Sequence, residues 1–142
     1  MIQPEPQKAP LLVITSQVVR GGISGRGLSF ALERIGHDVW FLPTVLLPWH
    51  PGQGKGTRIV ASSEDFSALA GDLAASPKLA ELGGVMTGYL GNAEQAAPVA
   101  ALVRAVKTAK QDALYKCDPV IGDHNSATGG GLYVPKATAE AI

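Results

Sequence analysis

Two aspartates that follow a strand-like segment are the residues best suited to metal and phosphate chemistry. Asp118 directly precedes Pro119, and Asp123 follows five residues later. Proline fixes φ, lacks a backbone donor and disfavours helix in the residue before it, so the buried strand that we predict over 113–117 must end here. Two carboxylates at a strand tip can hold Mg²⁺ directly or through water. Aspartate is also common in turns, where it bonds its own backbone, and the spacing leaves both interpretations open.

A second group of polar residues lies in the segment 44–57, which we predict to be a mobile loop that orders over a ligand. Its many prolines and glycines oppose regular structure, and loops of this kind are either functional or flexible. His50 is either a ligand for substrate or a surface residue. The run around Lys55 is not a phosphate-binding P-loop, because Gly56 follows the lysine and Trp49 stands where the first glycine is required.

Apolar runs separated by helical periodicity predict the elements that position these residues. Strands are expected at 11–14, 39–42, 83–88 and 113–117, the second stopped by Pro43. The helix between the first two strands ends at Gly36, and the next two begin near Ser62 and Asn92. A last helix starts at Pro135. The expected buried faces of the three longer helices are Leu28, Ala31, Leu32 and Ile35; Phe66, Leu69, Ala70 and Leu73; and Val99, Leu102, Val103 and Val106.

Strand and helix alternate along the chain, which predicts an α/β fold with a Rossmann-like parallel sheet and helices on both faces. The carboxyl ends of parallel strands meet at one rim, where ligands bind in open α/β sheets. We therefore expect the polar residues that follow the apolar runs to share this rim: Ser16, Thr44, Tyr89 and Asp118.

The composition fits one soluble domain and excludes several other classes. Of the 142 residues 46% are hydrophobic and 17% charged, with 12 basic and 12 acidic residues. No basic run favours nucleic acid or an anionic membrane as partner. A single cysteine cannot form an intramolecular disulfide. Residues 1–10 are a polar, proline-rich and flexible leader without the features of a signal peptide, and no apolar run can cross a bilayer, so we expect a cytoplasmic protein.

The order and spacing of several motifs resemble the N-terminal half of pyridoxal kinases, in the ribokinase-like superfamily. The resemblance extends from about Leu11 to Ile142. The motifs that carry it are Ser16-Gln17-Val18-Val19, Val39-Trp40, Thr44-Val45, His50 with Gly54-Lys55, Thr87-Gly88-Tyr89-Leu90-Gly91-Asn92-Ala93-Glu94-Gln95, Cys117-Asp118-Pro119-Val120-Ile121-Gly122-Asp123 and Gly131-Leu132-Tyr133-Val134.

This resemblance implies an ATP- and Mg²⁺-dependent kinase that phosphorylates the 5′-hydroxyl of pyridoxal, pyridoxine or pyridoxamine, as a homodimer. Ser16 and Thr44 would bond the substituents of the pyridine ring, and the loop around His50 would cover the substrate. The implied substrate-binding residues are Ser16, Thr44, His50 and Tyr89. Asp118 and Asp123 would lie on the nucleotide and phosphate side, with Asp118 as metal ligand.

The chain departs from the family pattern in several places. Ser24-Gly25 stands where a Gly-Asn pair is usual, Gln17 replaces a histidine, and residues 48–51 replace a Ser-Asn-His-Thr string. The Gly-Thr-Gly-Asp motif that carries the family's catalytic Asp lies beyond Ile142, so no residue of this chain is assigned as catalytic, and we predict that the chain alone is inactive.

Two alternatives to an N-terminal portion of a pyridoxal kinase are open. One is a non-catalytic truncated kinase, or a vitamin- or nucleotide-binding module that associates with a full-length subunit. The other is a flavodoxin-like or similar small α/β module in which Asp118 matches the motif by chance. We also expect a chain of this length to leave one edge of the sheet unpaired.

Overall fold

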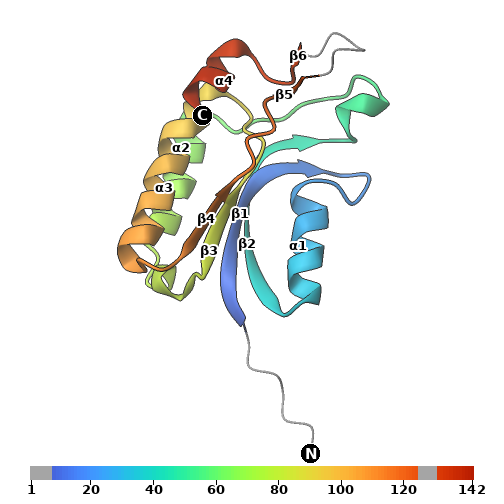
Figure 1. Cartoon of the computed structure of the whole chain (residues 1–142). Coiled ribbons are helices and arrows are strands. Elements are labelled where there is room, and N and C mark those ends of the chain that lie inside the picture. Colours follow the sequence, from blue (N-terminus) through green and yellow to red (C-terminus); the bar gives the residue numbers. More distant parts are fainter. Residues whose placement is uncertain (1–7, 125–130) are drawn as a thin grey trace, which may run out of the picture.

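The computed structural model describes residues 8–124 and 131–142, and Figure 1 shows an α/β fold with one main sheet. Its strands are β1 (Lys8–Val18), β2 (His37–Leu47), β3 (Gly84–Thr87) and β4 (Leu114–Cys117). They are all parallel and lie in the order β2-β1-β3-β4. This confirms the predicted parallel sheet and its four strands. Strand β1 begins at Lys8, so the last residues of the predicted leader belong to the sheet, and residues 1–7 lie outside the described part.

Helices cover both faces of this sheet, as the alternation of strands and helices predicts (Figure 1). Helix α1 (Gly25–Arg34) packs against β1 and β2, whereas α2 (Ser63–Ala74) and α3 (Ala96–Ala109) lie side by side on the other face. Short 3₁₀ turns are η1 (Pro51–Gln53), η2 (Leu79–Glu81) and η3 (Ala93–Gln95). A small antiparallel pair, β5 (Gly122–Asp123) and β6 (Gly131–Leu132), precedes α4 (Lys136–Ala141).

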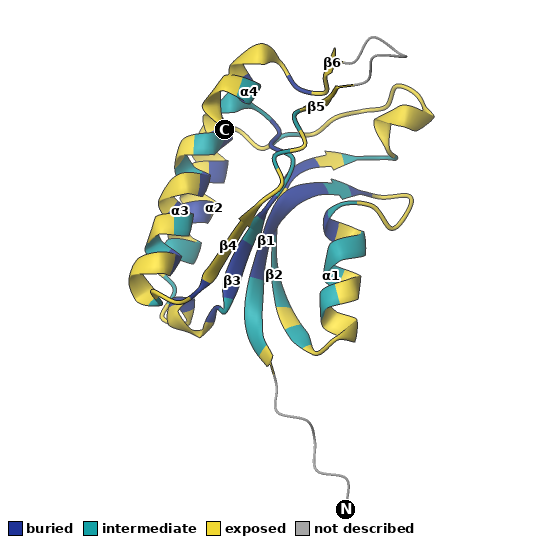
Figure 2. Ribbon diagram, in the orientation of Figure 1, coloured by how far each residue is buried: buried dark blue, intermediate teal, exposed yellow. Residues whose placement is uncertain are grey.

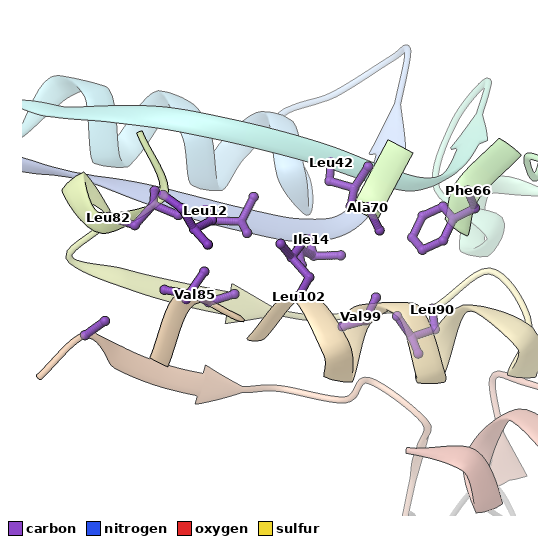
Figure 3. Packing of buried hydrophobic residues seen from close by; sticks show 13 residues of the cluster. Leu12, Ile14, Leu42, Phe66, Ala70, Leu82, Val85, Leu90, Val99 and Leu102 are labelled. Atoms are coloured by element: carbon purple, nitrogen blue, oxygen red, sulfur yellow. The ribbon is translucent and has the colours of Figure 1, made fainter. Parts of the chain in front are cut away.

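The hydrophobic core lies between the sheet and the layer formed by α2 and α3. Figure 3 shows Ile14 of β1 next to Leu102 of α3, Leu12 nearer to Leu82 and Val85, and Phe66 of α2 at one end of the cluster. Burying one such side chain contributes roughly 1.5–3 kcal/mol. Val13, which points to the opposite face, is also fully buried, so β1 is covered on both sides as its continuous apolar run predicts.

Polar caps define where the helices of this layer begin. Ser62 Oγ accepts a hydrogen bond from the Asp65 backbone N–H at 3.1 Å, which caps α2. Asn92 Oδ1 accepts from the Gln95 N–H at 3.2 Å, so η3 leads directly into α3, and Pro98 falls in the first turn of that helix. Both starts agree with the sequence prediction.

Strand β2 runs through Pro43 to Leu47, so the prediction that Pro43 ends the strand is wrong. β2 is an edge strand, where a residue without an N–H group is tolerated. The register also shifts just beyond this point, since Thr15 pairs with Pro43 whereas Gln17 pairs with Leu46. This places an extra residue in β2, a β-bulge, and prolines within sheets are found at edge strands and bulges. The irregular segment therefore begins at Pro48, and Thr44 belongs to the sheet.

Strand β4 is exposed, contrary to the predicted buried strand over 113–117 (Figure 2). Leu114 is 76% exposed, and only Ala113, just before the strand, is buried. β4 pairs with β3 alone, so among the described residues it is the second edge of the sheet, and the expected unpaired edge is present. An apolar run indicates a strand but does not say whether a neighbouring element covers it.

Two of the predicted helical faces are also only partly buried. Leu28 and Leu32 of α1 are half-buried, whereas Ala31 and Ile35, which follows the last residue of α1, are exposed. On α2, Leu69 is exposed. The predicted face of α3 is correct, with three residues buried and Val103 packed against the core. None of the described helices is both long and apolar enough to span a membrane.

Candidate functional site

The predicted rim of polar residues is confirmed by the register of the sheet. Thr15 pairs with Pro43, so Ser16 and Thr44 come next at the same end of β1 and β2. On the other side of β1, Thr87 is level with Ile14 and Cys117, and the chain continues from these strands into Gly88-Tyr89 and Asp118. The four predicted residues thus lie at the carboxyl edge, the usual ligand-binding edge of an open α/β sheet.

A cavity of about 350 Å³ opens at this rim, and we name it the Ser16 cavity. Its walls come from the ends of β1 and β2, from the turn η1 and from the segment around β6. Ser16 is 6% exposed, and its hydroxyl makes no hydrogen bond to the described residues, so it is available to a ligand. The residues lining the cavity are Ser16, Val18, Ser24, Leu47, His50, Pro51, Gly52, Tyr89, Val120 and Tyr133.

His50 lies at the mouth of the Ser16 cavity and caps η1. Its Nδ1 accepts a hydrogen bond from the Gly52 N–H at 3.1 Å. A neutral imidazole that accepts at Nδ1 carries its proton on Nε2. His50 can therefore offer a donor to a ligand in the cavity, and its predicted place in a loop that covers the substrate stays a prediction.

Tyr89 is held from three directions, so that its ring forms a fixed wall of the Ser16 cavity. Its N–H donates to Thr15 Oγ1 at 3.1 Å, and its carbonyl accepts from Thr44 Oγ1 at 2.6 Å. Arg58 Nη2 lies 3.4 Å from the phenol oxygen and also donates to the Gly91 carbonyl. These bonds join the ends of three strands to the segment that follows η1.

Thr44 is placed beneath the cavity and not in its wall. The side chain is 1% exposed, and its hydroxyl is already bonded to Tyr89. The Thr44 carbonyl accepts from Gln95 Nε2 at 2.8 Å, and Gln95 Oε1 accepts from the Gly91 N–H at 2.7 Å. Sequence reasoning assigned no role to Gln95 or Arg58. A glutamine directly before a helix in a Gly-Asn-rich turn was the available signal for Gln95.

A second cavity of about 300 Å³, the Asp118 cavity, lies on the α1 face of the sheet. It is lined by Val13, Thr15, Ser24, Leu28, Met86, Thr87, Gly88, Lys116, Asp118 and Val120. Asp118 is exposed, and its backbone N–H donates to the Thr87 carbonyl at 2.8 Å, which continues the strand pairing up to the predicted break.

Asp123 lines neither cavity, so the structure does not place the two predicted carboxylates in one pocket. It lies in β5, where its Oδ2 accepts a hydrogen bond from the Tyr133 phenol. No cluster of three or more His, Cys, Asp or Glu side chains suited to a metal occurs within 8–124 and 131–142. Among the residues that line the Ser16 and Asp118 cavities, Asp118 is the carboxylate. One or two carboxylates together with water and phosphate oxygens commonly hold Mg²⁺ in proteins.

Tyr115 in β4 adds a neutral hydroxyl near this end of the sheet. Its phenol oxygen lies 3.0 Å from Thr87 Oγ1. Burial raises the pKa of Tyr115 above its ordinary value, and the hydrogen bond with Thr87 opposes that rise. The phenol is therefore protonated at neutral pH and can donate to Thr87.

No protein-family model matches the chain. Solved structures of pyridoxal kinases do match it. The Leishmania donovani enzyme, solved with ADP and pyridoxamine, is 31% identical with a TM-score of 0.82, covering 94% of this chain and 45% of that one. The Entamoeba histolytica enzyme is 19% identical with a TM-score of 0.82, over 95% and 46%. The Trypanosoma brucei enzyme is 25% identical with a TM-score of 0.72, over 79% and 42%.

These matches define first the class of the fold, which is the ribokinase-like α/β fold. Within that class they confirm the resemblance to pyridoxal kinases that the motifs indicate. The chain spans less than half the length of the solved pyridoxal kinases that it matches.

Proposed function

We propose that the chain is the vitamin-binding part of a pyridoxal kinase, which transfers phosphate from ATP to the 5′-hydroxyl of a pyridoxal-type vitamer. The observation that carries the proposal is the 31% identity with the Leishmania donovani pyridoxal kinase over 94% of this chain. That enzyme was solved with ADP and pyridoxamine and also with ADP and pyridoxine, and the Entamoeba histolytica enzyme was solved with PLP.

The vitamer would occupy the Ser16 cavity, whose size and lining suit a small aromatic ring with polar substituents. The Ser16 hydroxyl would bond a ring substituent, His50 Nε2 would donate to another, and Tyr89 would form a flat wall. The buried bond from Thr44 to Tyr89 supports a positioning role for Thr44. Its predicted direct contact with the vitamer stays a prediction.

The phosphate groups would lie on the side of Asp118, which would hold Mg²⁺ together with water and phosphate oxygens. When bound, the ion would neutralise charge on the transferred phosphoryl group. The assignment of Asp123 to the phosphate side is likewise a proposal, and its bond to Tyr133 gives it a second role in orienting a wall of the Ser16 cavity.

We expect the isolated chain to bind the vitamer without phosphorylating it. Phosphoryl transfer needs a base or orienting group at the acceptor hydroxyl and preorganised donors for the transferred phosphate. The chain contains no Gly-Thr-Gly-Asp motif. Loss of such donors alone costs on the order of a hundredfold in rate. A binding module that associates with another subunit, including a homodimer, is the alternative, and the exposed edge strand β4 favours it.

Equilibrium titration of the purified chain with pyridoxine, pyridoxal and pyridoxamine tests the proposal. We expect measurable binding that Ser16→Ala weakens by about 0.5–1.5 kcal/mol, the net contribution of one hydrogen bond. Ser67→Ala is the matched control, because Ser67 is exposed on α2 away from the cavity. Absence of binding by the unmodified chain would contradict the proposed site. ATP-dependent formation of pyridoxal phosphate by the chain alone, free of host kinase, would contradict its predicted inactivity.

A further inference from the structure

The Ser16 cavity and the Asp118 cavity meet at two residues. Ser24 and Val120 are the residues that line both cavities. Ser24 lies just before α1, and Val120 follows the Asp118-Pro119 break at the end of β4. The boundary between the two cavities is therefore formed by one polar and one apolar side chain from opposite ends of the chain.

The same two residues have an unusual backbone conformation. Within the described part of the chain, Ser24 (φ 51°) and Val120 (φ 47°) are the non-glycine residues with positive φ. Side chains with a Cβ rarely adopt this region, least of all β-branched ones such as valine. Residues held in such conformations cluster at ligand-binding and active sites. The chain retains side chains at this boundary where glycine would fit the backbone with less strain.

The serine at position 24 is not explained by helix capping. A serine before a helix ordinarily accepts a hydrogen bond from the N–H group two or three residues later. Ser24 precedes α1 without any side-chain capping bond, and its hydroxyl makes no hydrogen bond within residues 8–124 and 131–142. Only the backbone of Ser24 is bonded. Its carbonyl accepts a hydrogen bond from the Leu28 N–H at 2.9 Å, and its backbone forms an isolated antiparallel β-bridge with Gln17. The hydroxyl is left for a ligand.

We infer that Ser24 is a further substrate-binding residue, whose hydroxyl bonds the oxygen of the vitamer's 5′-hydroxymethyl group. This inference rests on the proposed function. A vitamer in the Ser16 cavity must direct its acceptor hydroxyl toward the phosphate side, and the Asp118 cavity is reached past Ser24 and Val120. Ser24 supplies the polar group of this boundary, which can both donate and accept, and Val120 supplies the apolar surface for the methylene carbon.

The test compares pyridoxine with its analogue that lacks the 5′ oxygen, 5′-deoxypyridoxine. Binding of each to the full 142-residue chain is measured by calorimetric titration for the unmodified protein, Ser24→Ala and Ser24→Gly. We expect both substitutions to weaken pyridoxine binding by about 2- to 10-fold, the range of one hydrogen bond, and to leave binding of the analogue unchanged. Ser29→Ala is the control within α1, because its hydroxyl is buried without a partner and lines neither cavity.

Two variants at position 24 separate binding from folding. Ser24→Gly relieves the backbone while removing the hydroxyl, whereas Ser24→Ala removes the hydroxyl alone. Equal losses for pyridoxine and the analogue, or no loss for pyridoxine, would overturn the role of Ser24 while leaving the proposed function intact. If the unmodified chain bound neither compound, the proposed function and the role of Ser24 would both be contradicted. A loss in Ser24→Ala that Ser24→Gly restores would show that backbone conformation and not the hydroxyl controls binding, which also contradicts the inference.

Discussion

On one face of the sheet, Leu102 and Val106 of α3 are 1% and 0% exposed, whereas on the other face Ile35, at the end of α1, is 55% exposed. Both faces are built from strands of the same sheet, so the difference arises from the helices. The α2–α3 layer encloses the core, and the Asp118 cavity lies on the α1 face beside Leu28. The helix layer on the α1 face is thus packed less closely than the α2–α3 layer, which leaves room for a cavity that a close-packed core does not allow.

The largest expected loss of stability comes from a substitution in the core on the α2–α3 side. Leu102→Ala should lower the free energy of unfolding by about 2–5 kcal/mol, because it leaves a cavity among fully packed neighbours. Ile35→Ala on the α1 side is the matched change and should cost about 0.5 kcal/mol or less. Urea denaturation followed by circular dichroism measures both. Equal losses of unfolding free energy in the two variants would contradict the difference in packing between the two faces.

A smaller loss of stability is expected from a substitution at Gly25, a tightly packed place on the α1 side. A Cβ added at Gly25 would lie 2.1 Å from Phe41 Cζ and 3.0 Å from the Ser16 carbonyl oxygen. Gly25→Ala should therefore destabilise by about 1–3 kcal/mol, the usual cost of overpacking. Because Ser16 lines the Ser16 cavity and its carbonyl oxygen is one of the crowded atoms, vitamer binding should weaken as well.

Gly71→Ala is the control for Gly25→Ala. Gly71 lies inside α2 with no atom within 4 Å of an added Cβ, so alanine should stabilise by about 0.5–1 kcal/mol through its helix preference. Thermal and urea unfolding compare the two variants. A neutral Gly25→Ala would show that α1 can move away from the sheet, and the α1 side would then be looser than described.

The smallest change in stability is expected from a substitution at Ser24, just before α1. Ser24→Gly should raise the free energy of unfolding by about 1 kcal/mol. The strain that glycine removes at the positive φ is larger than the free energy lost because glycine makes the unfolded chain more flexible. Ser62→Gly before α2 is the counterpart on the packed side. There φ is −57° and the hydroxyl caps the helix, so glycine should cost a few tenths of a kcal/mol. The urea midpoint of unfolding should rise for Ser24→Gly and fall for Ser62→Gly. If both midpoints fell, the backbone of Ser24 would not be strained.

The sequence by itself determined the parallel sheet and the rim that carries the polar residues. Apolar runs and helical periodicity are local signals, and parallel strands must all end at one edge, so Ser16, Tyr89 and Asp118 could be placed together from their order alone. The helix starts at Ser62 and Asn92 were equally predictable, because a cap bonds to residues only a few positions away.

Only the tertiary structure decided which surfaces are covered and which side chains already have partners. β4 carries a pattern typical of a buried strand but lies at an edge, and Pro43 is tolerated because β2 is an edge too. Thr44 is bonded to Tyr89, 45 positions along the chain, and Asp123 to Tyr133. Ser24 and Val120 come to line the same two cavities only through folding. Contacts between residues far apart in sequence depend on how elements pack, and no local pattern encodes that packing.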